Sequence, residues 1–561
     1  MFRKKQKRNK EAIIDPEDIF FDVQNVSKFD EQQFEGVIQK PLGKNITLVF
    51  IVLILVSFLV FFIRLWDIQI TDGALYFRKA EDNRLNSFPI FAERGVIFDR
   101  NGIALVKNET EEGIEGGVKR VYKSPGFSHL LGYVKYPERD RNGYFWRKQI
   151  TGISGIEKTF DEELRGRNGA ILIEVNAHGE EEHNNRLLEA ISGENVHLTI
   201  DSAIQTALYN SIQDTVESGG FNAGSAVILN VGNGEVVAAT NYPEFDNNLL
   251  SLGKDKEGIK TELYDKRNRF LNRAFHGLYS PGSTVKPFIA LAALHEEVIT
   301  TQTNVMSTGT LIVPNIYNPD KPSIFRDWRP GGHGRTDIFH AIADSVNTFF
   351  YIIGGGRDGT DGLGIDRIHA TMTAFGLGEV IDTIFFNGPS GTVPSRDWKQ
   401  EIFDERWYLG DTYNTSIGQF GFITTPIHMA VAVAAIANRG ELVTPTLTTD
   451  GGVRSDLVDI IFSDEEYNII HRAMRRTVTH GTARTLSDLG VKIAGKTGTA
   501  QVGKNNEFVN SWFIGFYPYD EPKYAIALVL ERGTTGGQVS AAQAVRQMFM
   551  NLEKEEEKVE N

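Results

Sequence analysis

A serine and a lysine three residues apart, Ser283 and Lys286, lie where a turn leads into a long apolar run. Pro281 and Gly282 form the turn in SPGSTVKPFIALAAL, and residues three apart share one face of a helix. A serine at a helix N-terminus can act as a nucleophile, and a buried lysine near a second cation loses proton affinity and can act as its base. Capping of the helix by Ser283 is the alternative interpretation, because serine is a good N-cap residue. This stretch alone leaves both interpretations open.

A second serine–lysine pair, Ser251 and Lys254, has the same spacing. A pair of this kind occurs by chance about once in a chain of this size. Its surroundings, NNLLSLGKDKEGIK, place Gly253 inside the pair and charged residues after it, which is typical of a loop or a poor helix. We therefore predict that Ser251 has no catalytic role.

Two later stretches also hold polar residues among apolar neighbours. In AIADSVNTFFYIIGG, Ser345 and Asn347 lie two residues apart across a short turn within a helical region, and buried polar groups need partners. In VKIAGKTGTAQV, an apolar strand leads into Lys496–Thr499, which offers a cation, two hydroxyls and a glycine that lets a substrate backbone approach closely. Helix capping is the alternative for the first stretch, and a hairpin turn is the alternative for the second.

An apolar run near the start of the chain predicts a transmembrane helix over residues 46–66. The run NITLVFIVLILVSFLVFFIRLW holds about 18 uncharged residues, enough to cross the hydrocarbon core, and Trp66 suits the interface. A buried core helix is the alternative, but the run has no polar face. The basic start MFRKKQKRNK places the N-terminus in the cytoplasm and the chain after Trp66 outside. We expect residues 1–45 to form a disordered cytoplasmic tail.

The rest of the 561-residue chain is long enough for more than one domain. Residues 67–195 read as short strands, with a hairpin signal in RGVIFDRNGIAL (94–105). Residues 196–553 begin with the predicted strand VHLTI, and further strands are predicted near both ends of this region. Between them lie apolar helical stretches at 287–294, 338–353 and 426–437. This pattern predicts an antiparallel sheet packed on helices, an α+β domain. Residues 554–561 read as a solvated acidic tail.

Composition excludes several classes of function. The net charge of −14 argues against a nucleic-acid partner, because such proteins usually carry a basic face. The chain contains no cysteine, which excludes disulfides, thiolate catalysis and cysteine-bound zinc or iron–sulfur sites.

The order Ser-x-x-Lys, Ser-x-Asn, Lys-Thr-Gly is the signature set of penicillin-binding proteins and serine β-lactamases. The chain resembles the class B penicillin-binding proteins, and within them the elongation-type penicillin-binding protein 2. The resemblance covers nearly everything after the apolar run, including GISGIEKTFDEELRG, GENVHLTID and LNRAFHGLYSPGSTVKP. RDWRPGGHGR and WYLGDTYNTSIGQ favour the elongation type over the division type. The family fold is a transmembrane helix, a small mostly-β pedestal domain and an α+β transpeptidase domain like that of the serine β-lactamases.

The resemblance implies roles for the first two motifs. Ser283 is the nucleophile that becomes acylated, and Lys286 is the base that takes its proton. Ser345 relays protons, and Asn347 holds the substrate amide.

The resemblance also implies roles for the third motif. Lys496 supports the electrostatics of the site, and Thr497 and Thr499, separated by Gly498, bind the substrate carboxylate and backbone. The backbone N–H groups of Ser283 and Thr499 form the oxyanion hole.

The implied reaction is cross-linking of peptidoglycan stem peptides during cell-wall elongation and cell-shape maintenance. An acyl-enzyme forms on Ser283 as the D-Ala–D-Ala bond breaks, and an amine of a neighbouring stem then attacks it. β-Lactams trap the same serine. No cofactor is implied. The implied location is the cell membrane, with the catalytic domain outside, and the implied partners are a SEDS-type glycosyltransferase and proteins of the elongation complex.

Two other functions remain open at this point. A carboxypeptidase or β-lactamase-type hydrolase would need a positioned base to activate water, and we identify no such residue. A non-catalytic β-lactam sensor or scaffold would be expected to lack one of the three motifs, and all three are present.

The sequence departs from the family pattern at two places. Between residues 108 and 126 only ETEEGIEGGVKRVYKSP stands where the typical member has a far longer head subdomain, which puts the contacts of that head with partners in doubt. Some relatives bind zinc through two Asp, a His and a Cys. Asp327 and His333 match two of these positions, whereas Ser307 and Val346 occupy the others. A serine and a valine cannot complete a tetrahedral zinc site, so we predict no metal and expect Asp327 and His333 to form a structural contact.

Overall fold

A computed structural model of the protein describes residues 44–73 and 85–560, apart from short gaps. The gaps are residues 113, 115–116, 124, 142–144, 176–180, 316–317, 319, 358–359, 450–454, 459, 535 and 538. The chain divides into two compact units, one of residues 1–86 with 174–183 and one of residues 87–173 with 184–561.

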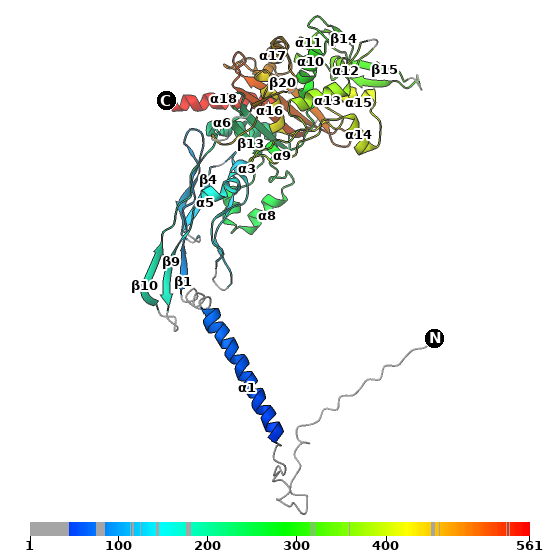
Figure 1. Ribbon diagram of the computed structural model, residues 1–561. Helices are drawn as coiled ribbons and strands as arrows, with labels where there is room; N and C mark the ends of the chain where they lie inside the picture. The colour runs from blue at the N-terminus through cyan, green and yellow to red at the C-terminus, as the bar shows by residue number, and fades with distance from the viewer. Residues whose placement is uncertain are drawn as a thin grey trace, which may run out of the picture. The chain divides into compact units, whose positions relative to one another are not determined.

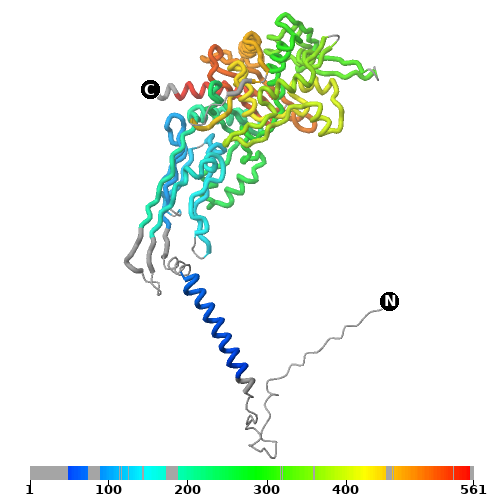
Figure 2. The backbone as a smooth tube through the Cα atoms, viewed as in Figure 1, coloured from blue at the N-terminus to red at the C-terminus, as the bar shows by residue number. Residues whose placement is uncertain are grey.

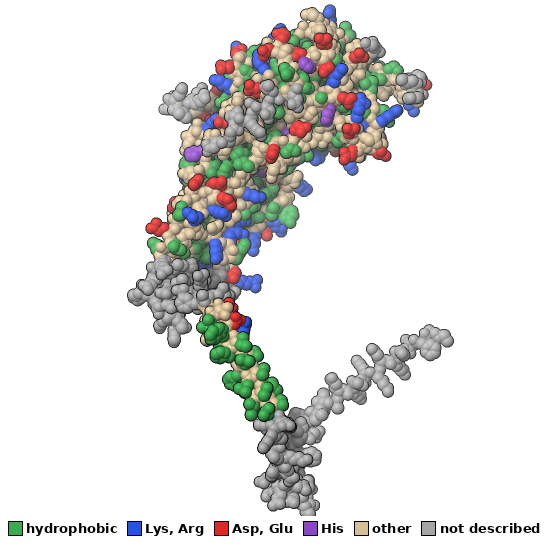
Figure 3. All heavy atoms as spheres, viewed as in Figure 1, with side chains coloured by type: hydrophobic (Ala, Val, Ile, Leu, Met, Phe, Trp, Pro, Cys, Tyr) green, Lys and Arg blue, Asp and Glu red, His purple; other side chains and the backbone are tan. Residues whose placement is uncertain are grey.

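The first unit contains one long apolar helix, α1 (Lys44–Trp66), which continues as the short π-helix η4 (Asp67–Thr71). Residues 48–71 are long and apolar enough to cross a membrane, with a mean hydropathy of 3.1. Hydrophobic side chains cover this helix (Figure 3), and they are exposed from Leu48 to Trp66. The helix agrees with the predicted span and is consistent with a single-pass membrane anchor. The predicted tail of residues 1–45 lies almost wholly outside the described residues.

The second unit begins with small sheets. One has the order β11-β2-β3-β4, with β2 (Ile97–Phe98), β3 (Ala104–Thr110), β4 (Val118–Tyr122) and β11 (Val196–His197). The hairpin predicted over 94–105 is confirmed, because β2 and β3 pair antiparallel and Asp99 Oδ1 accepts hydrogen bonds from the turn amides of Asn101 (2.9 Å) and Ile103 (2.7 Å). β3 and β4 pair directly, so the shortened head segment is a simple hairpin.

The remaining elements of this region are short. A sheet of order β1-β9-β10 contains β1 (Leu85–Ile90), β9 (Gly169–Val175) and β10 (Glu181–Leu188). The two-stranded pairs are β5 (Val134–Lys135) with β8 (Thr151–Gly152), and β6 (Glu138–Arg139) with β7 (Phe145–Arg147). The helices are α3 (Ser128–Leu131), α4 (Gly155–Thr159) and α5 (Asp161–Arg165).

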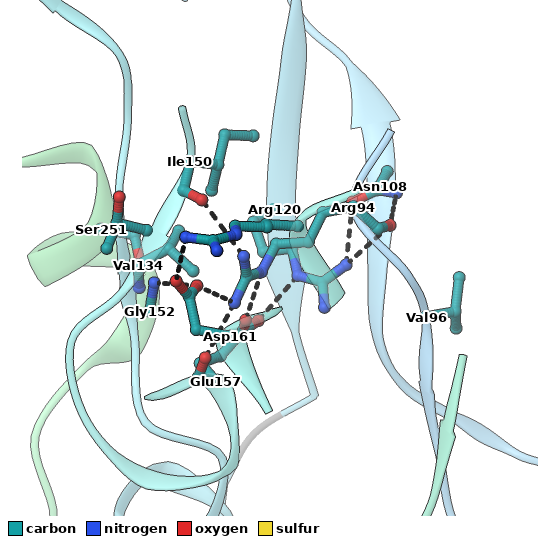
Figure 4. A network of polar contacts seen from close by, with 12 residues as sticks. Arg94, Val96, Asn108, Arg120, Val134, Ile150, Gly152, Glu157, Asp161 and Ser251 are labelled. Carbon is teal, nitrogen blue, oxygen red and sulfur yellow. Dashed lines mark hydrogen bonds and ion pairs between the residues drawn. The ribbon is translucent and has the colours of Figure 1, made fainter. Parts of the chain in front are cut away.

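Buried ion pairs join these elements around Glu157 (Figure 4). Its carboxylate receives Arg94 Nε at 2.6 Å and Arg120 Nε at 2.7 Å, and Asp161 makes a second contact to Arg94 at 2.8 Å. Burial alone would raise the pKa of Glu157, but the two guanidinium groups outweigh it and hold the pKa below its usual value. The network therefore fixes α4 and α5 against β4 through buried ion pairs, although one guanidinium nitrogen of Arg120, Nη2, is buried without a hydrogen-bond partner.

The predicted strand VHLTI does not belong to the second domain alone. Val196 pairs in parallel with Ile97 of β2, whereas Leu198 bridges to Thr448. The strand thus passes from the pedestal sheet into the larger region, because its pairing is set by a distant partner that local sequence does not show. The domain boundary at residue 195 stays a prediction.

A five-stranded antiparallel sheet forms the centre of the larger region, as predicted. Its order is β13 (Val236–Tyr242), β12 (Ala223–Asn230), β22 (Tyr524–Thr534), β21 (Phe508–Tyr517) and β20 (Ala494–Val502). The early strand β12 lies beside the late strand β22, so the two ends of the region meet inside one sheet (Figure 2). Alternate residues of β12 enter two different cores: Val227 and Leu229 enter one, and Ala226 and Ile228 the other.

Helices cover both faces of this sheet. α6 (Ser202–Gly219) and α18 (Ala541–Glu560) pack together on one face, and α16 (Pro426–Ala437) packs on the other, with α10 (Lys286–His295) and α17 (Asp464–Thr479) in the same core (Figure 1). Asp201 caps α6, since its side chain accepts from the N–H groups of Ala203 and Ile204. α18 stays helical through Glu560 and so includes most of the predicted acidic tail, whose solvation stays a prediction.

The other helices of this region are α7 (Asn247–Leu252), α8 (Lys256–Tyr264), α9 (Arg273–His276), α11 (Ile338–Ala343), α12 (Asn347–Gly355), α13 (Gly364–Ala374), α14 (Arg396–Phe403) and α15 (Leu409–Thr415), with the 3-10 turns η5 (Gly282–Val285) and η6 (Arg484–Leu486). Three strand pairs complete it: β14 (Val305–Ser307) with β17 (Gly334–Thr336), β15 (Thr310–Val313) with β16 (Ser323–Arg326), and β18 (Glu441–Val443) with β19 (Ser455–Leu457).

Candidate active site

Ser283 lies in the 3-10 turn η5, which leads directly into α10. The helix predicted at 287–294 is confirmed, and Pro287 occupies its first turn, where a missing N–H costs little. The N-cap residues of η5 and α10 are Pro281 and Val285, and neither helix has a side-chain cap. The interpretation of Ser283 as a helix cap is therefore wrong.

The chain around this turn is held by backbone contacts. Gly282 has a positive φ of 54°, and a Cβ there would lie 2.9 Å from the carbonyl oxygen of Thr499. Its N–H donates to the carbonyl of Gly418 at 3.0 Å, and the hydroxyl of Ser280 donates to the same oxygen at 2.8 Å. The indole N–H of Trp512 donates to the carbonyl of Ser280 at 3.0 Å. The turn is thus fixed from the sheet and from the segment after α15.

Lys286 joins the first motif to the second. Its side chain is fully buried, and its Nζ donates to the carbonyl of Ser345 (2.9 Å), to the hydroxyl of Ser345 (3.2 Å) and to Oδ1 of Asn347 (2.7 Å). The ring of Phe350 covers the amine at 5.2 Å from its centroid. One amine therefore organises both polar residues of the second motif.

The two buried lysines of the site both have lowered pKa values. Burial holds the pKa of Lys286 well below its usual range, and the charge of Lys496 lowers it further, whereas Asp327 opposes the shift. Burial lowers the pKa of Lys496 to about 7, with Asp344 opposing the shift. Lys286, three residues after Ser283, is thus better suited than an ordinary lysine to accept a proton from it.

The second motif lies in the helical region predicted over 338–353, at the short turn that the sequence indicates there. The structure has two helices, α11 and α12, separated at residues 344–346. Ser345 in this break has a positive φ of 57°, a conformation that is unfavourable for a residue with a side chain. The break turns the carbonyl and hydroxyl of Ser345 toward Lys286 together with the amide of Asn347.

The third motif lies on β20, the last strand of the sheet, so the hairpin-turn interpretation is wrong. Lys496 and Gly498 are buried, whereas Thr497 is half-buried and Thr499 exposed, as the alternation of a strand requires. A Cβ at Gly498 would lie 2.7 Å from Cγ2 of Thr284. The absence of a side chain at Gly498 therefore lets β20 lie against the turn that carries Ser283. The sequence predicts the close approach of a substrate backbone at this glycine, and its packing against Thr284 is a separate reason for the missing side chain.

Thr482 also belongs to the site, although the sequence gives no signal for it. Its hydroxyl lies 2.5 Å from the hydroxyl of Thr497, and its N–H donates to the carbonyl of Ala343 at 3.0 Å. It lies in a turn after α17 and in none of the three motifs. It links the end of α11 to β20.

The positions that hold zinc in some relatives do not fit a metal here. Asp327 and His333 are in contact at 3.3 Å, but the other oxygen of Asp327 accepts from the N–H of Thr348 at 2.9 Å. Ser307 accepts from the hydroxyl of Thr348 at 2.7 Å, and Val346 is a buried apolar residue. Within the described part of the chain, no group of three or more His, Cys, Asp or Glu is arranged to hold a metal.

The second serine–lysine pair is not part of this site. α7 ends at Leu252, and Gly253 with a φ of 65° stops it before Lys254, so the pair does not share a helix face. The hydroxyl of Ser251 accepts from the N–H of Val134 at 3.2 Å (Figure 4). Ser251 therefore joins α7 to the pedestal.

Comparison with known proteins agrees with this arrangement. A family model described as the penicillin-binding protein transpeptidase domain matches residues 224–550, more than half of the chain. The chain belongs to this family. A second model, the penicillin-binding protein dimerisation domain, matches residues 112–198.

Known penicillin-binding proteins resemble the chain over most of its length. The peptidoglycan D,D-transpeptidase MrdA of Haemophilus influenzae is 31% identical over 85% of this chain and 78% of its own. A crystal structure of Pseudomonas aeruginosa PBP2 in complex with WCK 5153 is 31% identical, covers 83% of this chain and 96% of that one, and has a TM-score of 0.65. A chain in a peptidoglycan synthase complex is 25% identical, covers 91% of this chain and 98% of that one, and has a TM-score of 0.69. The predicted resemblance to penicillin-binding protein 2 is confirmed.

Proposed function

We propose that this penicillin-binding protein is a peptidoglycan D,D-transpeptidase that works through an acyl-enzyme on Ser283. The observation that carries the proposal is Lys286: a buried amine with a lowered pKa, three residues after Ser283 and hydrogen-bonded to both polar residues of the second motif. The name of the Haemophilus influenzae relative supports the same activity.

The acylation step follows from these positions. Lys286 takes the proton of Ser283, whose oxygen attacks the carbonyl of the penultimate D-Ala of a stem peptide. The backbone N–H groups of Ser283 and Thr499 stabilise the oxyanion. As the C–N bond breaks, the amine of the terminal D-Ala leaves with a proton delivered through Ser345, and an ester on Ser283 remains.

The transfer step restores the serine. An amine of a neighbouring stem attacks the ester carbonyl, loses its proton to Lys286 and forms the cross-linking amide, while Ser283 regains a proton. Asn347 holds the amide of the bound stem. Thr497 and Thr499 receive the substrate carboxylate, which the charge of Lys496 attracts.

The proposal places the enzyme in the cell membrane. α1 is the single anchor, the basic N-terminus is cytoplasmic and the transpeptidase domain is extracytoplasmic. The similar chain in a peptidoglycan synthase complex supports a partner that polymerises glycan, which we take to be a SEDS-type glycosyltransferase, together with proteins of the elongation complex. The role is cell-wall elongation and maintenance of cell shape.

Covalent labelling of the full-length protein in detergent tests the proposal. A fluorescent penicillin should label the wild type, Ser283→Ala should take no label, and Ser251→Ala, the matched control, should label like the wild type. A wild type that takes no label, or a Ser283→Ala variant that labels equally, would show that the mechanism is wrong. Incubation with donor and acceptor stem peptides then separates transfer from hydrolysis, since a carboxypeptidase would release D-Ala without forming a cross-linked product.

A further inference from the structure

The turn that carries Ser345 and Asn347 has few contacts of its own. They are the N–H of Ser345 to the carbonyl of Ile342 at 3.3 Å and the N–H of Val346 to that of Ala341 at 3.0 Å. Ser345 has the left-handed backbone conformation, which costs free energy and persists only where surrounding contacts impose it. α12, which begins at Asn347, has the apolar residue Val346 at its N-cap and no side-chain cap from its own chain segment. Its first amides must therefore find partners elsewhere.

Two consecutive residues after β16 supply contacts on the two sides of this turn. Oδ2 of Asp327 accepts from the N–H of Thr348 at 2.9 Å, in the first turn of α12. The indole N–H of Trp328 donates to the carbonyl of Asp344 at 3.0 Å, at the end of α11. Asp327 and Trp328, which are adjacent in the sequence, thus hold the segment from Asp344 to Thr348 at its two ends.

These two residues are themselves fixed by their surroundings. The N–H of Asp327 donates to the carbonyl of Gly309 at 2.9 Å, and its Oδ1 lies 3.3 Å from Nε2 of His333. The ring of Trp328 packs edge-on against the ring of His333, with centroids 5.3 Å apart. The hydroxyl of Thr348 donates to Ser307 of β14 at 2.7 Å. The contacts therefore rest on the β14–β17 pair and not on a flexible loop end.

We propose that Asp327 and Trp328 form a bracket that positions Ser345 and Asn347 around the amine of Lys286. The bracket consists of the two hydrogen bonds to Thr348 and Asp344, and both residues are positioning residues that do not touch the reacting atoms. The inference rests on the proposed function, because it concerns the acylation of Ser283. Side-chain and backbone hydrogen bonds hold the second motif here.

The bracket predicts a specific kinetic effect. Release of either side lets the strained turn relax, and Ser345 and Asn347 then move away from Nζ of Lys286. The chemical step slows, whereas noncovalent binding of a penicillin changes little, because its carboxylate is held from β20. Since both sides constrain one turn, their losses are not additive.

The test measures acylation of the full-length protein by fluorescent penicillin in single-turnover experiments, which separate the maximal acylation rate from the noncovalent dissociation constant. Trp328→Phe keeps the ring and removes only the N–H donor, and Asp327→Ala removes the acceptor. Each should lower the maximal rate about tenfold, the scale of one lost hydrogen bond, with the dissociation constant within about twofold of the wild type. The maximal acylation rate of the double variant should be at most about thirtyfold below that of the wild type, because the two losses overlap.

Two further variants serve as controls. Asp327→Asn keeps an acceptor oxygen for Thr348 and should restore most of the rate lost in Asp327→Ala. Asp337→Asn changes the N-cap of the neighbouring helix α11, where the carboxylate accepts from the N–H of His340 at 2.9 Å, and should leave the maximal rate unchanged.

The outcomes separate this inference from the proposed function. A Trp328→Phe variant that acylates at the wild-type rate overturns the bracket, even if Ser283→Ala abolishes labelling as expected. The bracket is also overturned if Trp328→Phe weakens the dissociation constant and the maximal rate equally, since that pattern indicates general damage. If Asp327→Ala does not fold, Trp328→Phe decides alone. Labelling of Ser283→Ala would instead overturn the proposed function.

Discussion

Nζ of Lys286 lies 2.7 Å from Oδ1 of Asn347, so the first and second motifs meet at one buried amine. The contact joins residues 61 positions apart in the sequence, on α10 and α12. A neutral lysine here can exchange a proton with Ser283, and the amide oxygen keeps its nitrogen oriented. The protonation states of Lys286 and Lys496 should therefore govern the rate.

We expect the acylation rate to rise with pH well below pH 10.5. Only neutral Lys286 can take the proton of Ser283, and burial with the nearby charge of Lys496 holds its pKa well below the usual value. The rate should fall as the pH passes about 7, because Lys496 then loses the charge that attracts a carboxylate. Labelling rates with fluorescent penicillin, measured from about pH 5 to about pH 10, give this profile.

Lys496→Arg provides the control for the falling limb. Arginine stays charged throughout this pH range, so the decrease above about pH 7 should disappear in the variant. A wild-type rate that keeps rising to the pH of free lysine would contradict the lowered pKa values of both residues.

Thr482 should contribute to acylation although it lies outside the motifs. A carboxylate can only accept hydrogen bonds, so Thr497 must donate to it and accept from Thr482, which lies 2.5 Å away. Thr482→Val should reduce the labelling rate about fivefold, and Thr482→Ser should restore it. Thr479→Val is the matched control, because the Thr479 hydroxyl bonds only to carbonyl groups of its own helix and to His480. Equal rates for Thr482→Val and the wild type would exclude the relay.

The residues that the sequence predicts for the site do come together, because each motif brings its own local structure. The Pro-Gly turn before Ser283 leads into an apolar helix, and the alternation around Lys496 forms a strand. The apolar runs of α16 and of the central strands also match their predicted positions. Local periodicity is sufficient for such elements.

The features that the sequence does not predict depend on contacts between distant segments. The sequence indicates a short turn at Ser345 and Asn347 but not its geometry, because Lys286, Asp327 and Trp328 reach the turn from distant segments. The pairing of Val196 with Ile97 of β2 is not visible in the local sequence, because the two residues lie 99 positions apart. Thr482 has no motif, since its role depends on the position of Thr497 across the fold.

Gly498→Ala should separate the third motif from the nucleophile turn. The new Cβ would lie 2.7 Å from Cγ2 of Thr284 and 3.0 Å from the carbonyl oxygen of Pro281, so β20 must shift. Overpacking of this kind costs about 1–3 kcal/mol of stability, and a shift of the oxyanion-hole amide should lower the labelling rate at least about tenfold. Thermal unfolding and fluorescent penicillin measure the two effects.

Gly331→Ala is the matched control for this substitution, because no atom lies within 4 Å of its added Cβ. It should keep the wild-type labelling rate and melting temperature. If Gly498→Ala labelled as fast as Gly331→Ala, the close approach of β20 to the turn would have no importance for acylation.

Glu157→Gln should destabilise the pedestal without changing the chemistry of the site. The carboxylate is fully buried between Arg94 and Arg120, and its removal leaves the two guanidinium groups with only the half-buried Asp161 nearby. Loss of one partner from a buried ion pair costs about 3–5 kcal/mol, so thermal unfolding should begin at a markedly lower temperature. The surface pair of Asp366 with Arg396 gives the control: Asp366→Asn should change stability by less than about 1 kcal/mol. Below its unfolding temperature, Glu157→Gln should acylate at the wild-type rate, since Lys286 keeps all its partners; a slower rate in the folded variant would show instead that the pedestal network acts on the active site.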